Sequence, residues 1–172
     1  MAKADNIFLV GLMGAGKSTI GKKLAERLGK TFVDADKEIE QRTGATIELI
    51  FDIEGEEGFR QREAAMLDEL TGRDNVVLAT GGGAVLLPEN RERLASRGTV
   101  VYLRAPVEVL ARRMENDKKR PLLQGGDKTE RLTELLEQRE PFYLDSADVI
   151  INSSNMPLKK VVDRILKSLK PQ

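Results

Sequence analysis

Short apolar runs alternate along the chain with longer stretches in which apolar residues recur every three or four positions. The short runs are typical of strands buried on both faces, and the longer spacing is typical of amphipathic helices. The pattern predicts strands at residues 7–10, 31–33, 76–80, 99–103 and 148–151. It predicts helices at residues 17–28, 88–97, 107–115, 129–143 and 158–169. A further, mainly helical region over residues 37–72 is interrupted by Gly44, Gly55 and Gly58.

Strands that alternate with helices indicate an α/β domain with a parallel sheet and helices on both of its faces. The chain of 172 residues is long enough to bury a substantial core, and no linker or internal repeat divides it, so we expect one domain over residues 1–172. Ligands bind such sheets beyond the carboxyl ends of the strands. The segments 11–18, 34–36 and 81–83 all follow strands, and they are predicted to converge on one cleft.

A phosphate-binding loop follows the first predicted strand. Four residues separate Gly11 from Gly16-Lys17-Ser18, which is the Walker A spacing in its strand–loop–helix context. The backbone N–H groups of such a loop, together with the start of the next helix, bind phosphates. Lys17 can reach the outer phosphates, and the Ser18 hydroxyl can ligate Mg2+. The sequence therefore predicts a site for a nucleoside triphosphate, rather than an ordinary tight turn.

Composition narrows the chemistry. The 28 Lys and Arg residues balance 28 Asp and Glu residues, which argues against a protein that coats nucleic acid. There is no cysteine or histidine, so a disulfide, a thiol nucleophile, a cysteine zinc site and a histidine base are excluded. The apolar run before Gly11 is too short for a signal peptide, and no later stretch approaches a membrane span. We expect a cytoplasmic protein with no membrane partner.

Two further segments at strand ends are candidates for binding a second ligand. Asp34 and Asp36 leave a strand two positions apart, and in an extended segment both would face the cleft. The alternatives are a solvated loop start or a helix N-cap at Asp36. The run from Gly81 to Gly83 exposes backbone with no side chain to obstruct a ligand, although a flexible turn would have the same composition.

Arginines outside the phosphate loop add a third and a fourth feature. Arg60 and Arg139 carry guanidinium groups suited to bidentate binding of a carboxylate, although a solvated arginine on a helix is the commoner case. Residues 116–128 are polar, basic and rich in glycine, and they include Arg120. Such a segment is typical of a lid that brings an arginine to a transferring phosphoryl group.

Together these motifs resemble the bacterial shikimate kinase family over nearly the whole chain. The residues that carry the resemblance are Gly11–Thr19, Asp34–Asp36, Gly58–Glu63, Thr80–Gly83, Arg120–Leu123 and Arg139–Tyr143. The resemblance implies a three-layer α/β/α P-loop NTPase fold whose five-stranded parallel sheet has the order 2-3-1-4-5. It also implies a substrate-binding helical region over about 37–72 and a lid over about 116–128. The implied reaction converts ATP and shikimate to ADP and shikimate 3-phosphate, on the route to chorismate and the aromatic amino acids.

The resemblance also implies a role for individual residues. Lys17, Asp36 and Arg120 would be catalytic, with Asp36 as the candidate base. The implied ATP-binding residues are Gly14, Ala15, Gly16, Lys17, Ser18, Thr19, Arg113 and Arg120. The implied shikimate-binding residues are Asp36, Arg60, Gly81, Gly82, Gly83 and Arg139. Mg2+ would be held by Ser18 and by Asp34, directly or through water. Arg113 would pack against the adenine, with residues 155–157 opposite, and the protein is expected to be a monomer.

Three alternatives remain at this point. The chain could be another P-loop kinase that acts on gluconate or a nucleotide, but Asp36, Arg60 and Arg139 together favour a small hydroxylated carboxylate. It could be a nucleotide-dependent regulator, although it lacks the Asn-Lys-x-Asp motif that reads guanine. It could also be an inactive binding module, and the presence of Lys17 and Arg120 argues against that.

Overall fold

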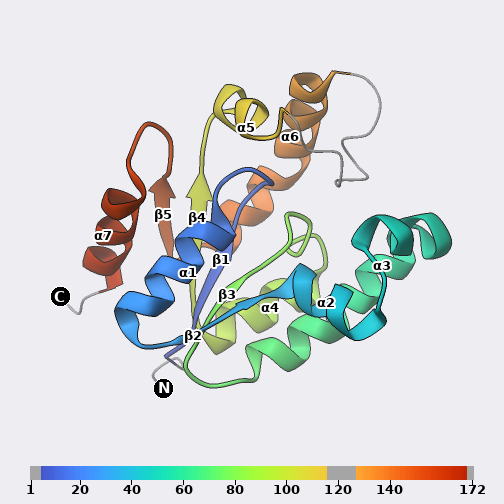
Figure 1. Cartoon of the computed structure of the whole chain (residues 1–172), viewed down its shortest axis with the longest axis horizontal. Coiled ribbons are helices and arrows are strands. Elements are labelled where there is room, and N and C mark those ends of the chain that lie inside the picture. The colour runs from blue at the N-terminus through green and yellow to red at the C-terminus, as the bar shows by residue number, and fades with distance from the viewer. Residues whose placement is uncertain (1–4, 116–126, 170–172) are drawn as a thin grey trace.

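The computed structural model describes residues 5–115 and 127–169 of the chain. Within these ranges a five-stranded sheet, parallel at every pairing, has the order β2-β3-β1-β4-β5, which confirms the predicted fold (Figure 1). The strands are β1 (Ile7–Val10), β2 (Thr31–Asp34), β3 (Val76–Ala79), β4 (Thr99–Arg104) and β5 (Val149–Asn152). The helices are α1 (Lys17–Leu28), α2 (Ala35–Thr43), α3 (Ile47–Thr71), α4 (Pro88–Arg97), α5 (Val107–Arg113), α6 (Lys128–Ser146) and α7 (Leu158–Leu169).

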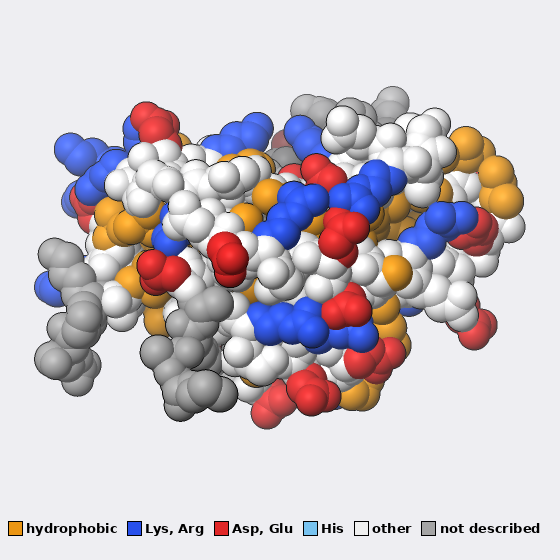
Figure 2. Space-filling model, turned by 90° about the horizontal axis from the view of Figure 1, so that it is seen from below, with side chains coloured by type: hydrophobic (Ala, Val, Ile, Leu, Met, Phe, Trp, Pro, Cys, Tyr) orange, Lys and Arg blue, Asp and Glu red, His pale blue; other side chains and the backbone are white. Residues whose placement is uncertain are grey.

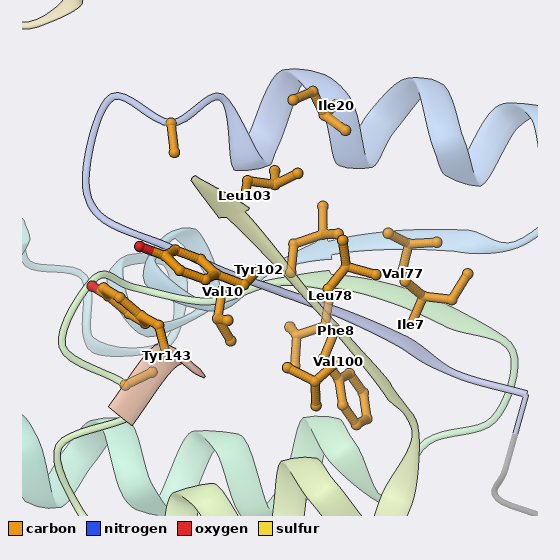
Figure 3. Packing of buried hydrophobic residues seen from close by; sticks show 14 of the residues in the cluster. Ile7, Phe8, Val10, Ile20, Val77, Leu78, Val100, Tyr102, Leu103 and Tyr143 are labelled. Carbon is orange, nitrogen blue, oxygen red and sulfur yellow. The ribbon is translucent and has the colours of Figure 1, made fainter. Parts of the chain in front are cut away.

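The three central strands form the core of the sheet. The register places Phe8 of β1 beside Leu78 of β3 and Val100 of β4, and all three side chains are fully buried. Figure 3 shows Ile20 of α1 on one side of these strands and the Phe8 ring on the other. Burial of each such side chain contributes about 1.5–3 kcal/mol, so packing between the helical layers holds the strands in place. The continuous apolar runs in the sequence reflect this burial on both faces.

Helices cover both faces of the sheet. α1 and α7 pack together on one face, and α4 and α6 pack against β4 on the other, where α3 lies against α4. α1 begins at Lys17 directly after the phosphate loop, and Gly29 ends it with a φ of 68°. Both boundaries agree with the sequence prediction. α6 continues through Pro141 to Ser146, three residues beyond its predicted end at Tyr143.

The region 37–72 departs from the prediction at one glycine. Gly44 ends α2 with a φ of 71°, and Gly55 interrupts α3 with a φ of 74° and a ψ of 177°. Gly58 was also predicted to break the helix, but this is wrong, because its backbone remains helical. A Cβ on Gly58 would lie 2.6 Å from the Cβ of Glu54. Gly58 is therefore required for space beside the kink and not for a break.

The outer surface mixes both signs of charge. Figure 2 shows acidic and basic side chains next to one another on one face of the molecule. Asp68 of α3 pairs with Arg93 (3.5 Å) and Arg97 (2.8 Å) of α4, so charged pairs also link neighbouring helices. Exposed pairs of this kind each contribute about 0–1 kcal/mol. Among the described helices, none combines the length and the apolar character needed to cross a membrane.

Asn6 precedes β1 and is hydrogen-bonded to the starts of β3 and β4. It can therefore be used to test how much these bonds stabilise the sheet. Its buried amide donates to the carbonyl oxygen of Arg73 (2.6 Å) and accepts from the N–H of Val76 (3.0 Å), while its own carbonyl accepts from the N–H of Thr99 (2.9 Å). We expect Asn6→Ala to lower the free energy of unfolding by about 1–3 kcal/mol, because the buried N–H of Val76 and the partly buried carbonyl of Arg73 lose their partner. Urea denaturation measures this change.

The matched control for Asn6 is Asn152→Ala. Asn152 is exposed, and within residues 5–115 and 127–169 its side chain accepts hydrogen bonds from Ser154 alone. A loss of stability as large as that of Asn6→Ala in this control would contradict the role of the Asn6 amide.

Candidate active site

The phosphate loop has the backbone shape that its glycines predict. Gly14 and Gly16 adopt φ angles of 86° and 94°, a region that residues with side chains rarely occupy. The Lys17 Nζ donates to the carbonyl oxygens of Gly11 (2.5 Å) and Leu12 (3.1 Å). The ammonium group therefore lies across the loop, close to where the outer phosphates of a nucleotide would bind.

The predicted metal ligands meet at the end of β2. The Ser18 hydroxyl donates to Oδ2 of Asp34 (2.6 Å), and Oδ1 of Asp34 accepts from the N–H of Lys37 (3.2 Å). Asp34 is therefore the N-cap of α2, and the alternative that gave the cap to Asp36 is wrong. Asp36 lies in the first turn of α2, so the chain turns between the two carboxylates and does not stay extended as expected. The two carboxylates nevertheless line the same pocket, the one beside the phosphate loop.

Two adjoining pockets connect the phosphate loop to the predicted acceptor site. The first pocket is lined by Lys17, Ser18, Asp34, Asp36, Gly81 and Gly82 among others. The second is lined by Asp36, Arg60, Glu63, Gly81, Gly82, Gly83, Arg139 and four apolar residues, Met13, Ile47, Phe51 and Phe59. Asp36 and two of the glycines belong to both pockets. The structure thus brings together all of the predicted shikimate-binding residues, from α2, α3, α6 and the segment after β3.

Both arginines of the second pocket are buried. Arg60 is 9% exposed and Arg139 is 2% exposed. The Arg60 Nη1 donates to Oε1 of Glu63 (2.9 Å), whereas Nε and Nη1 of Arg139 meet no acceptor within the described ranges. A buried cation with unmatched N–H groups is costly. This arrangement is suited to an anion that accepts hydrogen bonds from the guanidinium groups.

The glycine run is required for space beside these charged groups. A Cβ on Gly81 would lie 2.9 Å from Oδ1 of Asp36 and 2.9 Å from Oε2 of Glu63, and a Cβ on Gly83 would overlap the Arg60 guanidinium. The three glycines do not adopt positive φ angles. Lack of a side chain, and not turn geometry, therefore explains the composition of this segment.

Arg113 lies on the other side of the phosphate loop. Its guanidinium donates to the carbonyl oxygens of Gly14 (2.9 Å) and Ser153 (3.2 Å), so it bridges the loop and the segment after β5. Asn155 in that segment has a φ of 56°. This placement is compatible with the predicted adenine contact, which stays a prediction. Arg120 and the predicted lid, apart from residues 127–128, lie outside the described residues.

Comparison with known proteins identifies the family. The sequence profile described as shikimate kinase matches residues 13–170 of this chain. A shikimate kinase from Halorhodospira halophila is 55% identical over 168 residues, which cover 98% of this chain and 95% of that protein. The solved structure of shikimate kinase from Acinetobacter baumannii in complex with shikimate has a TM-score of 0.93 at 50% identity, covering 95% of this chain and 92% of that chain. The chain belongs to the shikimate kinase family.

Membership of the shikimate kinase family confirms the prediction of an ATP-dependent kinase and places the chain on the route to the aromatic amino acids. A gluconokinase from Sinorhizobium meliloti has a TM-score of 0.58 at 19% identity, with 98% of this chain and 93% of that chain covered. At that identity the two share only the fold. Membership of the shikimate kinase family, and not this likeness, decides against a gluconate-type kinase, a nucleotide-type kinase and a regulator.

Glu63 is a residue of the pocket to which the sequence analysis assigned no role. It is 1% exposed, and burial raises its pKa from 4.5 to about 6. The charges of Arg60 and Arg139 oppose the rise in pKa, and the charge of Asp36 adds to it. The available signal was the spacing, since a carboxylate three residues after Arg60 on a helix lies on the same face. The spacing alone does not identify a buried pair, because exposed pairs on helices have the same spacing.

The raised pKa of Glu63 predicts a pH-dependent contribution to stability. A folded-state pKa above the unfolded value stabilises the fold at pH values below 4.5, and this stabilisation is lost as the pH rises through about 6. We expect the free energy of unfolding of the wild type, measured relative to Glu63→Gln, to fall by about 2 kcal/mol between about pH 4.5 and about pH 7.5. Urea denaturation of both proteins at the two pH values measures this difference. A difference that stays constant with pH would contradict it.

Proposed function

We propose that the two pockets hold ATP and shikimate for transfer of the γ-phosphoryl group to the 3-hydroxyl, giving shikimate 3-phosphate and ADP. The observation that carries the proposal is the pair of buried arginines in a pocket that shares Asp36 with the pocket at the phosphate loop. A small anion with hydroxyl groups matches this combination of donors and acceptors. The Acinetobacter relative has shikimate bound, which supports the same assignment here.

Arg60 and Arg139 would bind the carboxylate of shikimate. They approach from α3 and α6, and each presents a planar guanidinium that is already removed from water. Binding therefore requires little further desolvation of the protein, which favours affinity. The carboxylate would be held at one end of the pocket, with the ring extending toward Asp36 and the phosphate loop.

Asp36 would orient the attacking hydroxyl. It lies where the two pockets meet, so it can accept a hydrogen bond from a hydroxyl that faces the γ-phosphate. Phosphoryl transfer depends mainly on in-line positioning and on charge neutralisation. Proton removal by Asp36 is a second, smaller contribution, since an ordinary carboxylate is a weak base at neutral pH. Lys17 would neutralise the outer phosphates, and Arg120 would close over ATP.

Ser18 and Asp34 would hold Mg2+. Their oxygens are 2.6 Å apart at the mouth of the phosphate loop, and oxygen ligands are those that Mg2+ prefers. Mg2+ usually takes one or two ligands from the protein and completes its shell with phosphates and water, so this small ligand set fits. Bound there, Mg2+ would supply positive charge that neutralises the charge developing on the phosphates. We also propose that the protein is cytoplasmic and monomeric. Size-exclusion chromatography with light scattering tests the monomeric state.

The proposed acceptor can be tested directly. Purified protein is mixed with ATP, Mg2+ and either shikimate, quinate, gluconate or AMP, and release of ADP is followed in a coupled assay. We expect turnover with shikimate to exceed that with each of the other acceptors. Faster turnover with gluconate or AMP would overturn the proposed function.

Arg139→Lys tests the carboxylate assignment. A lysine keeps the charge but cannot form two parallel hydrogen bonds, so we expect the KM for shikimate to rise about 10- to 100-fold while the KM for ATP changes little. Steady-state kinetics measure both constants. Arg97→Lys is the control, because Arg97 lines neither pocket and donates to Asp68 and Thr71 instead. An unchanged KM for shikimate in Arg139→Lys would contradict the assignment of Arg139 to the carboxylate.

Asp34→Asn tests the metal assignment without removing the cap of α2, since asparagine caps helices as well as aspartate does. We expect the Mg2+ concentration needed for half-maximal rate to rise about 10- to 100-fold at saturating ATP, because the site loses a negative oxygen. Asp127→Asn is the matched control, since Asp127 caps α6 through Thr129 and Glu130. An equal rise in both variants would show that the effect comes from the helix cap and not from a metal ligand.

A further inference from the structure

Gly55 divides α3 into two arms. Its backbone leaves the helical region, and a Cβ placed on it would meet no described atom within 4 Å. Residues 47–54 form the first arm, and residues 56–71 form the second. Both arms line the pocket of the buried arginines, which is the acceptor pocket of the proposed function, the first through Phe51 and the second through Phe59. The placement of one arm relative to the other therefore affects the shape of that pocket.

The first arm has few contacts that could hold it in place. All of its residues are described, and none of them joins the main apolar core around the sheet. Ile50 is buried in a small separate cluster with Ile39 and Phe59, whereas Ile53 is 73% exposed. Figure 1 shows the first turns of α3 at the edge of the molecule, away from the sheet. Contacts near the kink must therefore determine where this arm lies.

An ion pair connects the two arms across the kink. Oε1 of Glu54 accepts from Nε of Arg62, and Oε2 accepts from Nη2, both at 2.7 Å. Two parallel bonds between planar groups fix a direction as well as a distance. These hydrogen bonds lower the pKa of Glu54, so the carboxylate is charged at neutral pH. The rings of Phe51 and Phe59 also meet across the kink, with their centroids 4.8 Å apart.

Gly58 allows Glu54 to lie against the second arm. A Cβ on Gly58 would lie 2.6 Å from the Cβ of Glu54, so any side chain at this position would displace the carboxylate. The space that Gly58 leaves beside the kink is thus occupied by the first partner of the ion pair.

Arg60 and Arg62 have different surroundings although they are close in sequence. On a helix, two residues at this spacing point about 200° apart. Arg60 is 9% exposed, lines the acceptor pocket and donates to Glu63. The Arg62 side chain is 46% exposed and lines neither pocket of the site. Any effect of Arg62 on the acceptor must therefore be transmitted through the first arm.

We propose that Glu54 and Arg62 are positioning residues, whose ion pair holds the first arm of α3 where Phe51 borders the acceptor pocket. The inference rests on the proposed function, because it concerns the affinity of that pocket for shikimate. A partly exposed pair adds little to the stability of the whole fold. It can nevertheless raise the fraction of molecules in which the pocket is formed, and the apparent affinity is proportional to that fraction.

Glu54→Gln and Arg62→Gln test the proposal by steady-state kinetics. In each variant we expect the KM for shikimate to rise about two- to fivefold, with kcat and the KM for ATP within about 1.5-fold of the wild type. The turnover number is kept because bound shikimate itself contacts both arms in the complex. An unchanged KM for shikimate, or an equal rise in the KM for ATP, would overturn the proposal.

The sign of the two effects separates positioning from net charge. Glu54→Gln removes a negative charge and Arg62→Gln removes a positive one, so a field acting on anionic shikimate would lower the KM in the first and raise it in the second. Positioning raises the KM in both. Opposite signs would therefore overturn the proposal.

The double variant tests whether the two residues act as a pair. We expect Glu54→Gln with Arg62→Gln to raise the KM for shikimate no further than either change alone, because both remove the same contact. Multiplied effects would show independent roles and overturn the pair. Arg62→Lys keeps the charge but not the two parallel bonds, so we expect a smaller rise than in Arg62→Gln.

Asp163→Asn is the matched control. Asp163 of α7 accepts from Arg27 of α1 (3.2 Å), and this pair has a similar exposure but lies outside both pockets. We expect its KM for shikimate to stay within about 1.5-fold of the wild type. A rise equal to that in Glu54→Gln would show a general effect of surface charge and would overturn the proposal.

Thermal unfolding and the wild type complete the test. A fall in the thermal stability of Glu54→Gln with an unchanged KM for shikimate would mean a structural role only, and would overturn the proposal. If the wild type neither binds nor phosphorylates shikimate, the proposed function itself fails. If the wild type does both and the two single variants keep its KM for shikimate, only the positioning role fails.

Discussion

The active site is built around a cluster of charges that is buried at the carboxyl end of the sheet, and the rest of the structure has to accommodate it. Arg60, Glu63 and Arg139 are each less than a tenth exposed, and Asp36 lies beside them. Removing such groups from water is expensive, and their mutual attraction offsets the cost only when the geometry is good. The raised pKa of Glu63 shows that the cost is not fully offset, since burial outweighs two neighbouring cations. The fold therefore maintains a strained electrostatic environment, as binding and catalytic sites often do.

The surrounding elements explain how this cluster is tolerated. The charged groups come from three helices, α2, α3 and α6, and the apolar packing of the central strands holds these helices in position. The glycine run after β3 lets backbone approach the charges where any side chain would collide. Because the groups are desolvated before a ligand arrives, an incoming anion meets donors that are already oriented. Preorganisation of this kind links the stability of the fold to the affinity of the site.

Much of the fold and part of the site followed from the sequence. The Walker A loop was predictable because its function depends on local backbone geometry, which consecutive residues specify. The strand pattern was predictable because strands buried on both faces must be apolar throughout. Gly58 was wrongly predicted to break a helix because a glycine that provides space is not distinguishable by type from one that provides a turn. Asp34 and Asp36 reached the same cavity, but through a turn into a helix that alternation along a strand does not describe.

The sequence by itself determined the order of strands and helices, the phosphate loop and the types of residue available for chemistry, since these depend on neighbours along the chain. Only the tertiary structure decided which polar residues are buried together. The pairing of Arg60 with Glu63, the cap at Asp34 and the bond from Tyr143 to Gly82 belong to this second group. The last of these joins residues 61 positions apart. The physical reason is that burial and hydrogen bonding depend on distance in space, and packing of whole elements sets that distance.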